Sequence, residues 1–264
     1  MNILDTIIAR KRNEVKQRRE NRPEKILERH PHFIRQVYSL TNFLADATRT
    51  GIIAEYKRKS PSKGIINATA TVESVTTAYA QHASGISVLT DTEFFGGATV
   101  DLENARFNAV PILRKDFMID EYQVYEAKAM GADVILLIAA CLSPKQVNEL
   151  GACAKALGME VLLEIHNEAE LEHISDMVDM VGVNNRNLKT FEVNIQTSLQ
   201  LIDRIPAGKP AIAESGISNV DTIVTLRNAG FSGFLIGENF MKEPDPSVAF
   251  ADFVHQLKAR QYAN

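Results

Sequence analysis

The segment that decides the fold is IIAEYKRKSPSKG, which spans residues 52–64. It begins as an apolar run typical of a buried β-strand, and it ends abruptly in charge at Glu55 and Lys57. Burying a carboxylate without a cationic partner is costly, so Glu55 needs either a partner or a task. How this strand ends is therefore the first question that the chain raises.

Seven further β-rich runs follow the first one, and each begins 20 to 34 residues after the run before it. They are ISVLTD (86–91), PILRKD (111–116), DVILLIA (133–139), EVLLEI (160–165), MVGVNN (180–185), PAIAES (210–215) and GFLIGE (233–238). This spacing is too long for hairpins and suits a strand, a loop, a helix and a return loop. The unbroken apolar runs are typical of parallel strands that are covered on both faces.

The segments between these runs have the pattern of amphipathic helices with start and stop residues. Examples are SPKQVNELGACAKALGM at 143–159 and SNVDTIVTLRNAG at 218–230, each with a polar start and a glycine near its end. Eight such units in the 214 residues after position 50 predict an α/β fold, a closed (β/α)8 TIM barrel. A doubly wound open sheet is the alternative on pattern alone.

Composition and charge exclude several classes of protein. The chain has 264 residues, is 45% apolar and carries a net charge of -4, which fits an ordinary globular protein. Its longest apolar run, at 134–142, falls short of the roughly 20 residues of a membrane span, and the N-terminus has its cations after its apolar part, the reverse of a secretory signal. We expect a cytoplasmic protein with reduced, structural thiols at Cys141 and Cys153.

The first fifty residues are basic, with eleven Lys and Arg against six Asp and Glu. A cationic segment can bind nucleic acid, but this one contains glutamates, lacks interleaved aromatic residues and has apolar positions at helical spacing. Those positions are Ile3, Leu4, Ile7, Ile8 and Val15. A helix that covers the body of the protein with its charged face in water is therefore favoured over a nucleic-acid partner.

Polar residues follow most of the predicted strands at their carboxyl ends, where barrel enzymes carry their active sites. Folding would bring Glu55 and Lys57, Lys115, Glu164, Asn184 and Arg186, and Glu214 and Ser215 to one rim. Glu164 lies within an apolar frame, as Glu55 does, and Lys57 and Lys115 are the available cationic partners. The six histidines form no metal-binding constellation, and His166, near a strand end, is expected to be solvated rather than catalytic.

Two glycines and three phenylalanines near the rim suggest how a substrate is held. Gly216 and Gly237 follow the seventh and eighth strands, where barrels commonly bind phosphate, although a tight turn would also call for glycine. Ser60, Lys57 and Lys63 could add contacts from the first loop. Phe94, Phe95 and Phe117 either contact an apolar part of the substrate or plug the barrel mouth, and the pattern leaves both readings open.

The sequence resembles the indole-3-glycerol phosphate synthase family, cofactor-independent (β/α)8 enzymes of tryptophan biosynthesis. The resemblance rests on IIAEYKRKSPSKG, VLTDTEFFGG, PILRKDFMID, VLLEIHNEAEL, GVNNRNLKTFEV, AESGIS and FLIGENFMK, in that order between positions 52 and 242. It implies a carboxy-lyase that closes the ring of 1-(o-carboxyphenylamino)-1-deoxyribulose 5-phosphate with loss of carbon dioxide and water. It also implies that residues 1–264 form a single barrel domain, with residues 1–50 as a helical extension that packs on the barrel mouth.

The resemblance assigns roles to the rim residues. Lys115 corresponds to the general acid, Glu164 to the general base and Lys57 to a lysine of substrate binding and dehydration, while Glu55 and Asn184 orient the reacting groups. The remaining substrate-binding positions are Ser60, Phe95, Phe117, Leu136, Arg186, Leu188, Glu214 and Ser215. The phosphate-binding positions are Gly216, Gly237 and Glu238.

These expectations extend to partners. We expect a phosphorylated small-molecule substrate, no metal or other cofactor, no nucleic acid and no membrane. The chain is expected to be a monomer that could associate with other tryptophan-pathway enzymes. The alternative function is that of another phosphate-binding barrel, such as a sugar-phosphate isomerase, which would favour a cysteine or aspartate base near the first strand.

Overall fold

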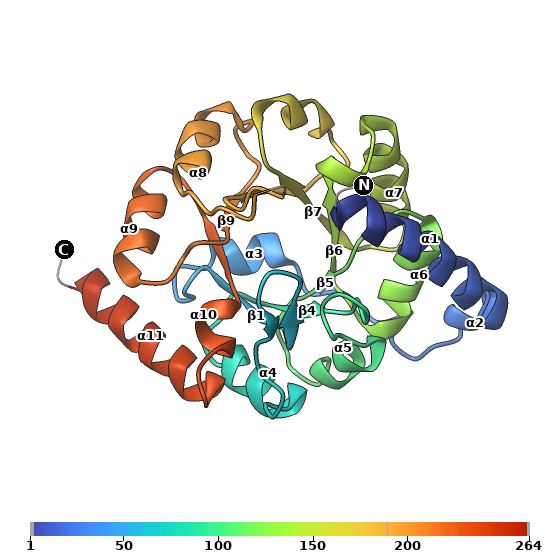
Figure 1. The fold of residues 1–264 in the computed structure, drawn as a ribbon, viewed down its shortest axis with the longest axis horizontal. Coiled ribbons are helices and arrows are strands. Elements are labelled where there is room, and N and C mark those ends of the chain that lie inside the picture. The colour runs from blue at the N-terminus through green and yellow to red at the C-terminus, as the bar shows by residue number, and fades with distance from the viewer. Residues whose placement is uncertain (1–2, 189, 263–264) are drawn as a thin grey trace.

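The computed structural model describes residues 3–188 and 190–262, and its centre is a closed barrel of eight strands (Figure 1). The strands follow one another around the barrel in the order β1-β10-β9-β8-β7-β6-β5-β4, and every neighbouring pair is parallel. The predicted (β/α)8 fold is therefore confirmed, and the open doubly wound sheet is excluded.

Each of the eight barrel strands overlaps a run predicted from the sequence. They are β1 (Ile52–Tyr56), β4 (Gly85–Leu89), β5 (Ile112–Lys115), β6 (Val134–Ile138), β7 (Glu160–Ile165), β8 (Met180–Asn184), β9 (Ala211–Glu214) and β10 (Gly233–Ile236). The loop after β1 contains an additional small antiparallel pair, β2 (Lys59–Ser60) and β3 (Gly64–Ile65), which the sequence pattern did not indicate.

Alternation along each strand explains which side chains reach the barrel interior. Leu113 and Leu162 belong to the inner core, whereas their neighbours Ile112 and Leu163 pack outward against the helices. Because strand side chains alternate between faces, Lys115 and Glu164, two residues further on, also point inward. The interior is thus apolar through the middle of the barrel and charged at the carboxyl ends of its strands.

Helices surround the barrel (Figure 1). They are α4 (Val72–Ala80), α5 (Thr99–Ala105), α6 (Glu121–Met130), α7 (Pro144–Ala156), α8 (Gln196–Leu201), α9 (Val220–Asn228), α10 (Glu238–Met241) and α11 (Pro246–Tyr262). Side chains and glycines cap these helices: the Ser143 side chain accepts from the Gln146 N–H, as its polar start predicted, and Gly131 ends α6 at φ 93°. Between β7 and β8 the chain forms only the 3₁₀ helix η2 (Glu168–His173).

The N-terminal extension starts at the carboxyl ends of the strands. There α1 (Ile3–Asn21) crosses the barrel mouth, and its apolar residues Ile3, Leu4 and Ile7 line the central cavity. The short helix α2 (Glu24–Leu27) then packs beside α6. The part of the extension that lies on the mouth is therefore α1.

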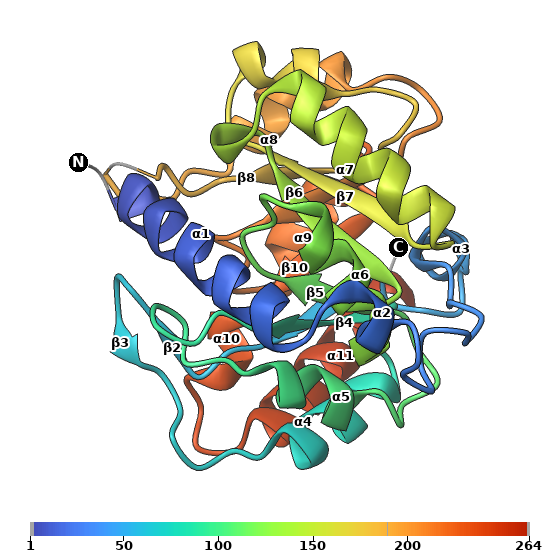
Figure 2. The ribbon, with the colours of Figure 1, turned by 90° about the vertical axis from the view of Figure 1, so that its right-hand side faces the viewer.

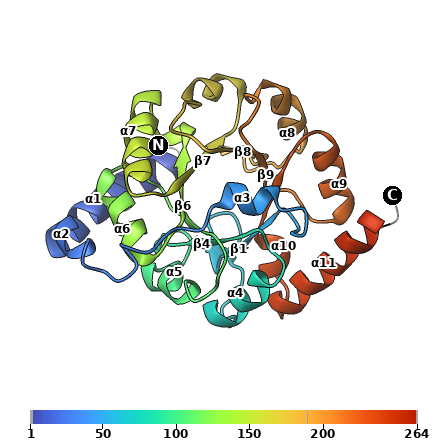
Figure 3. The ribbon, with the colours of Figure 1, turned by 180° about the vertical axis from the view of Figure 1, so that it is seen from behind.

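The remainder of the extension reaches the opposite end of the barrel, which the sequence expectation for residues 1–50 did not include. Figure 2 shows α1 and α3 (Leu40–Ala45) at opposite ends, and Figure 3 shows α3 across the bottom. Leu40 enters the inner core, and the Glu160 carboxylate at the start of β7 accepts the N–H groups of Leu40 (2.7 Å) and Thr41 (3.1 Å). These contacts hold α3 at the bottom.

Ion pairs with the acidic body account for much of the basic charge of the extension. Arg18 pairs with Glu126, Arg19 with Asp120 and Arg35 with Asp133. The charged face of the extension is thus partly directed at the protein itself. No helix in residues 3–188 and 190–262 has the length and hydropathy needed to cross a membrane.

Candidate active site

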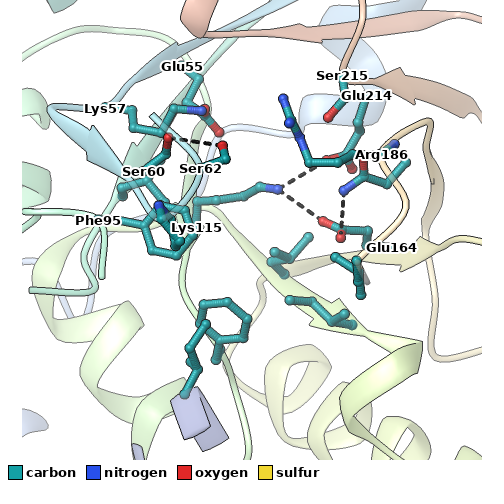
Figure 4. A pocket seen from close by; sticks show the side chains of 18 of the residues that line it. Glu55, Lys57, Ser60, Ser62, Phe95, Lys115, Glu164, Arg186, Glu214 and Ser215 are labelled. Atoms are coloured by element: carbon teal, nitrogen blue, oxygen red, sulfur yellow. Dashed lines mark hydrogen bonds and ion pairs between the residues drawn. The ribbon is translucent and has the colours of Figure 1, made fainter. Parts of the chain in front are cut away.

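The Lys115 side chain lies at the centre of the charged rim. Its Nζ donates to a carboxylate oxygen of Glu164 and to one of Glu214, both at 3.0 Å. Figure 4 marks both contacts with dashed lines. Burial opposes the charged form, but the surrounding carboxylates outweigh it and hold the pKa of Lys115 above its ordinary value. The side chain is therefore an ammonium at neutral pH, with a proton to donate.

The Glu164 carboxylate is held at both oxygens. One accepts from Lys115, and the other accepts from the Asn184 side-chain amide at 3.0 Å. Burial would raise the pKa of Glu164, but Lys115, His166 and Asn184 together hold it below its ordinary value. Asn184 is itself fixed, because its carbonyl oxygen accepts the Arg186 backbone N–H. Glu164 is thus ionised and pre-oriented.

Glu214 lies in a less favourable electrostatic position. Burial raises its pKa, and the negative charge of Glu164 raises it further, while Lys115 acts in the opposite direction. One Glu214 oxygen, Oε1, is buried without a hydrogen-bond partner. Glu164 and Glu214 share the single ammonium of Lys115, so the negative charge of Glu214 is only partly compensated.

A second ion pair lies across the cavity, between the Lys57 ammonium and the Glu55 carboxylate at 2.7 Å (Figure 4). Glu55 packs directly against Gly237 of the neighbouring strand end, where a Cβ atom would lie 2.5 Å from a Glu55 oxygen. Glycine at position 237 is therefore required by this close approach, whatever else its backbone does. The charged ending of the first strand thus has a cationic partner, Lys57.

The cationic end of the site is an adjoining cavity formed by the loops after β1, β8, β9 and β10. Its lining residues include Lys57, Lys63, Arg186, Ser215, Gly216, Gly237, Glu238 and Lys242. Ser215 and Gly216 have consecutive positive φ angles of 64° and 78°, and a Cβ at Gly216 would lie 2.6 Å from Val193. The Glu238 carboxylate lies 3.8 Å from both Lys63 and Arg186. The phosphate-binding positions suggested by the sequence therefore meet here.

The opposite wall of the main cavity is apolar. Its lining includes Leu89, Phe95, Phe117, Leu136, Ile138, Leu188 and Leu235, together with Ile3, Leu4 and Ile7 of α1. The rings of Phe95 and Phe117 lie 6.0 Å apart between centroids. Such a wall next to fixed charges suits a substrate that is aromatic at one end and anionic at the other.

His166 differs from the sequence expectation that it is solvated. Its side chain is only 9% exposed and lies between two carboxylates, with Nε2 3.2 Å from Glu164 and Nδ1 3.3 Å from Glu170. The expectation was wrong because it considered only the position after a strand. Glu170 of η2 reaches back to the strand end, where its carboxylate contacts the ring and accepts the backbone N–H of His166.

The structure brings the residues with assigned site roles to the two adjoining cavities, whereas Phe94 lines neither of them. Those that line the main cavity are Glu55, Lys57, Ser60, Phe95, Lys115, Phe117, Leu136, Glu164, Asn184, Arg186, Leu188, Glu214, Ser215 and Glu238. Gly216 and Gly237 line the cationic cavity. Sequence reasoning missed Ile3, Leu4 and Ile7 as lining residues, although their helical spacing was evident, and it missed Phe191, which lines both cavities at φ 60°.

Fold and site together define a (β/α)8-barrel enzyme with acid–base groups at the carboxyl ends of its strands. A family model described as indole-3-glycerol phosphate synthase matches residues 4–253. The chain therefore belongs to the indole-3-glycerol phosphate synthase family, and the predicted carboxy-lyase class is confirmed. The isomerase alternative is not favoured.

Individual relatives agree with the family model. A Bacteroides thetaiotaomicron indole-3-glycerol phosphate synthase is 45% identical over 258 residues, covering 97% of this chain and 99% of that protein. One from Polaromonas sp. is 45% identical over 255 residues, covering 94% and 97%. Among solved structures, a chain of the Pyrococcus furiosus tryptophan synthase complex matches with a TM-score of 0.62 at 17% identity, covering 80% of this chain and 99% of that chain. This last similarity bears on the fold alone.

Proposed function

We propose that this chain converts 1-(o-carboxyphenylamino)-1-deoxyribulose 5-phosphate to indole-3-glycerol phosphate with the rim residues in the roles that follow. The observation that carries the proposal is the Lys115 ammonium, fixed 3.0 Å from both Glu164 and Glu214 beside an apolar wall and a cationic cavity. This arrangement matches the substrate, which has an aromatic carboxylate at one end, a carbonyl in the middle and a phosphate at the other end.

In the ring closure, the ring carbon that bears the carboxylate attacks the substrate carbonyl carbon, and a carbon–carbon bond forms. Lys115 gives its proton to the carbonyl oxygen, which becomes a hydroxyl group. The carboxylate then leaves as carbon dioxide, and its bonding electron pair restores the aromatic ring. A fixed cation in a site shielded from water stabilises the charge that develops on the oxygen.

In the dehydration, the new hydroxyl group takes a proton and leaves as water, and a base removes one proton from the closing ring. Glu164 acts as this base, and Asn184 keeps its carboxylate in place. Lys57, held by Glu55, supplies the proton to the leaving hydroxyl group. Ring closure thus uses Lys115, and dehydration uses one member of each ion pair, Glu164 and Lys57.

The phosphate binds in the cationic cavity, between Lys63, Arg186 and the backbone N–H groups near Gly216 and Gly237. The chain turns sharply at Ser215 and Gly216, where φ is positive at both residues. In the structure, the Glu238 carboxylate lies 3.8 Å from both Lys63 and Arg186. A phosphate dianion takes over both cations, so Glu238 contributes its backbone rather than its carboxylate.

An activity assay with two variants tests these roles. Lys115→Met removes the acid and Glu164→Gln removes the base, so each should lower kcat about 10²-fold or more. Indole fluorescence reports the product, and circular dichroism checks the fold. The matched control is Lys145→Met, at an 85% exposed side chain on α7, which should turn over normally. Near-normal turnover in either rim variant contradicts the assigned role.

We further propose that the whole chain acts as one domain and as a cytoplasmic monomer, with association with other tryptophan-pathway enzymes as a weaker contact. The single domain is supported by the N-terminal extension, which contacts both ends of the barrel and lines the cavity through α1. Analytical ultracentrifugation checks the monomer, and the mass of a dimer would contradict it.

A further inference from the structure

His166 is a buried histidine that the proposed reaction leaves without a role. It lies two residues beyond Glu164 in the sequence, just past the end of β7, and its ring meets the Glu164 carboxylate at the oxygen that Lys115 does not contact. Its side chain is 9% exposed, and Nε2 lies 3.2 Å from the Glu164 oxygen that also accepts from Asn184. This is an ion-pair contact rather than an aligned hydrogen bond.

The other side of the ring is held by Glu170 of η2. Nδ1 lies 3.3 Å from a Glu170 oxygen, and the same oxygen accepts the backbone N–H of His166 at 2.7 Å. The second Glu170 oxygen accepts from the Asn167 side chain at 2.8 Å. Glu170 is therefore fixed to the strand end, and it fixes the ring in turn.

The surroundings favour the doubly protonated ring. Burial opposes its charge, but the carboxylates of Glu164 and Glu170 outweigh it and raise the pKa of His166 to about 10. The thiol of Cys141 lies near both carboxylates, and burial and these charges raise its pKa to about 12, so it stays neutral at neutral pH. Lys115 contacts the opposite oxygen of Glu164 and is linked to His166 through this carboxylate.

Two cations of different kinds, the Lys115 ammonium and the His166 imidazolium, thus contact the Glu164 carboxylate. The ammonium of Lys115 is the group that gives its proton to the substrate in the proposed reaction, and its charge is then lost. The imidazolium of His166 is held by Glu170 and does not line the cavity. We propose that His166 is a positioning residue, held by Glu170, that keeps Glu164 ionised and in place while Lys115 transfers its proton.

This inference rests on the proposed role of Glu164. It also predicts that the His166 ring is positively charged, which can be tested without measuring activity. NMR of imidazole nitrogens in the ligand-free full chain, assigned with His166→Gln, should show a doubly protonated His166 ring at pH 7 to 8. A neutral ring in that range overturns the inference, whatever the activity of the rim variants.

Kinetics provide the second test. His166→Gln can retain a donor toward Glu164 but carries no charge, and Glu170→Gln removes the carboxylate that holds the ring. His166→Gln removes the cation, and Glu170→Gln removes the contact that holds the cation beside Glu164. Either loss raises the pKa of Glu164, so the acid limb of the kcat profile should move to higher pH by about one unit or more in both variants. The matched control is Glu172→Gln, an exposed carboxylate on the same 3₁₀ helix.

The outcomes separate the two proposals. Acid limbs of His166→Gln and Glu170→Gln that coincide with the wild type, while Glu164→Gln is inactive, overturn the role of His166 alone. Normal turnover of Glu164→Gln overturns the assignment of the base itself. If His166→Gln does not fold, the acid limb of Glu170→Gln still decides the question.

Discussion

At the scale of single residues, Glu214 occupies a position in the site that lowers the stability of the fold when its carboxylate is charged. It is buried, one of its oxygens has no partner, and it shares the Lys115 ammonium with Glu164. Burial and the neighbouring carboxylate raise its pKa to about 7, above the ordinary carboxyl value. A carboxyl group whose pKa is raised by folding adds stability at low pH, and that contribution is lost as the pH rises through the folded-state pKa.

Glu214→Gln should therefore change stability differently at two pH values. At pH 5 the wild-type carboxyl is largely protonated, so the uncharged amide should have little effect. At pH 8 the variant avoids a buried charge and should gain about 1 to 3 kcal/mol of unfolding free energy. Thermal unfolding at both pH values measures this as a rise of about 2–4 °C per kcal/mol. An equal Tm difference at pH 5 and pH 8 contradicts the argument, and Glu172→Gln controls for surface charge.

The sequence predicts the role of a residue when the pattern that reveals it lies within one short segment of the chain. Lys115 and Glu164 stood out because charge within an apolar strand is unusual in any context. Gly237 was predicted as a phosphate position, but its contact with Glu55 depends on the pairing of β1 with β10, which are distant in the chain. The environment of His166 likewise depends on how η2 folds over the end of β7.

At the scale of elements, α1 is anchored by one buried cation. The Lys11 side chain is 1% exposed, and its Nζ lies 2.9 Å from Asp91, 2.9 Å from Asp116 and 2.8 Å from Glu14. Asp116 directly follows Lys115 and also pairs with Arg114. The helix that covers the mouth is thus tied to the loop that follows β5.

Lys11→Met should loosen α1 and leave buried carboxylates without their cation. Breaking a buried ion pair by removing one partner costs about 3–5 kcal/mol, which urea unfolding measures. KM should also rise, because α1 forms part of the cavity. The effect should shrink as the pH falls, since Lys11 helps to lower the pKa of Asp116 and that stabilising contribution disappears when the carboxyl is protonated.

A double variant separates charge from packing in this anchor. Asp91→Asn keeps the oxygen that accepts the Phe94 N–H, so Lys11→Met with Asp91→Asn should recover part of the lost stability. Strict additivity of the two substitutions would show that the ion pair is not the cause.

The elements themselves differ in how well their sequences predict them. The eight strands were recognisable because each is a continuous apolar run that alone indicates burial on both faces. The pair β2 and β3 consists of two residues each, too short for any periodicity. The position of α3 at the bottom depends on Glu160, which lies about 120 residues further along the chain. Such long-range contacts leave no local pattern.

At the scale of the whole molecule, one continuous N-terminal extension closes both ends of the barrel. Ile7 of α1 contributes to the cavity at the carboxyl ends of the strands, whereas Leu40 of α3 packs into the inner core at their amino ends. Both side chains are nearly completely buried, at 3% and 1% exposure. Barrels of this class commonly separate chemistry at one end from stability at the other.

The matched pair Ile7→Ala and Leu40→Ala tests this separation, because each removes a similar apolar group from one end. Leu40→Ala opens a cavity in the core and should cost about 2–5 kcal/mol of unfolding free energy while kcat and KM stay near the wild-type values. Ile7→Ala should cost less stability, since its side chain borders a cavity, and should raise KM several-fold. Urea unfolding and steady-state kinetics on the same preparations decide between the ends. A large kinetic defect in folded Leu40→Ala would show that the bottom of the barrel also shapes the site.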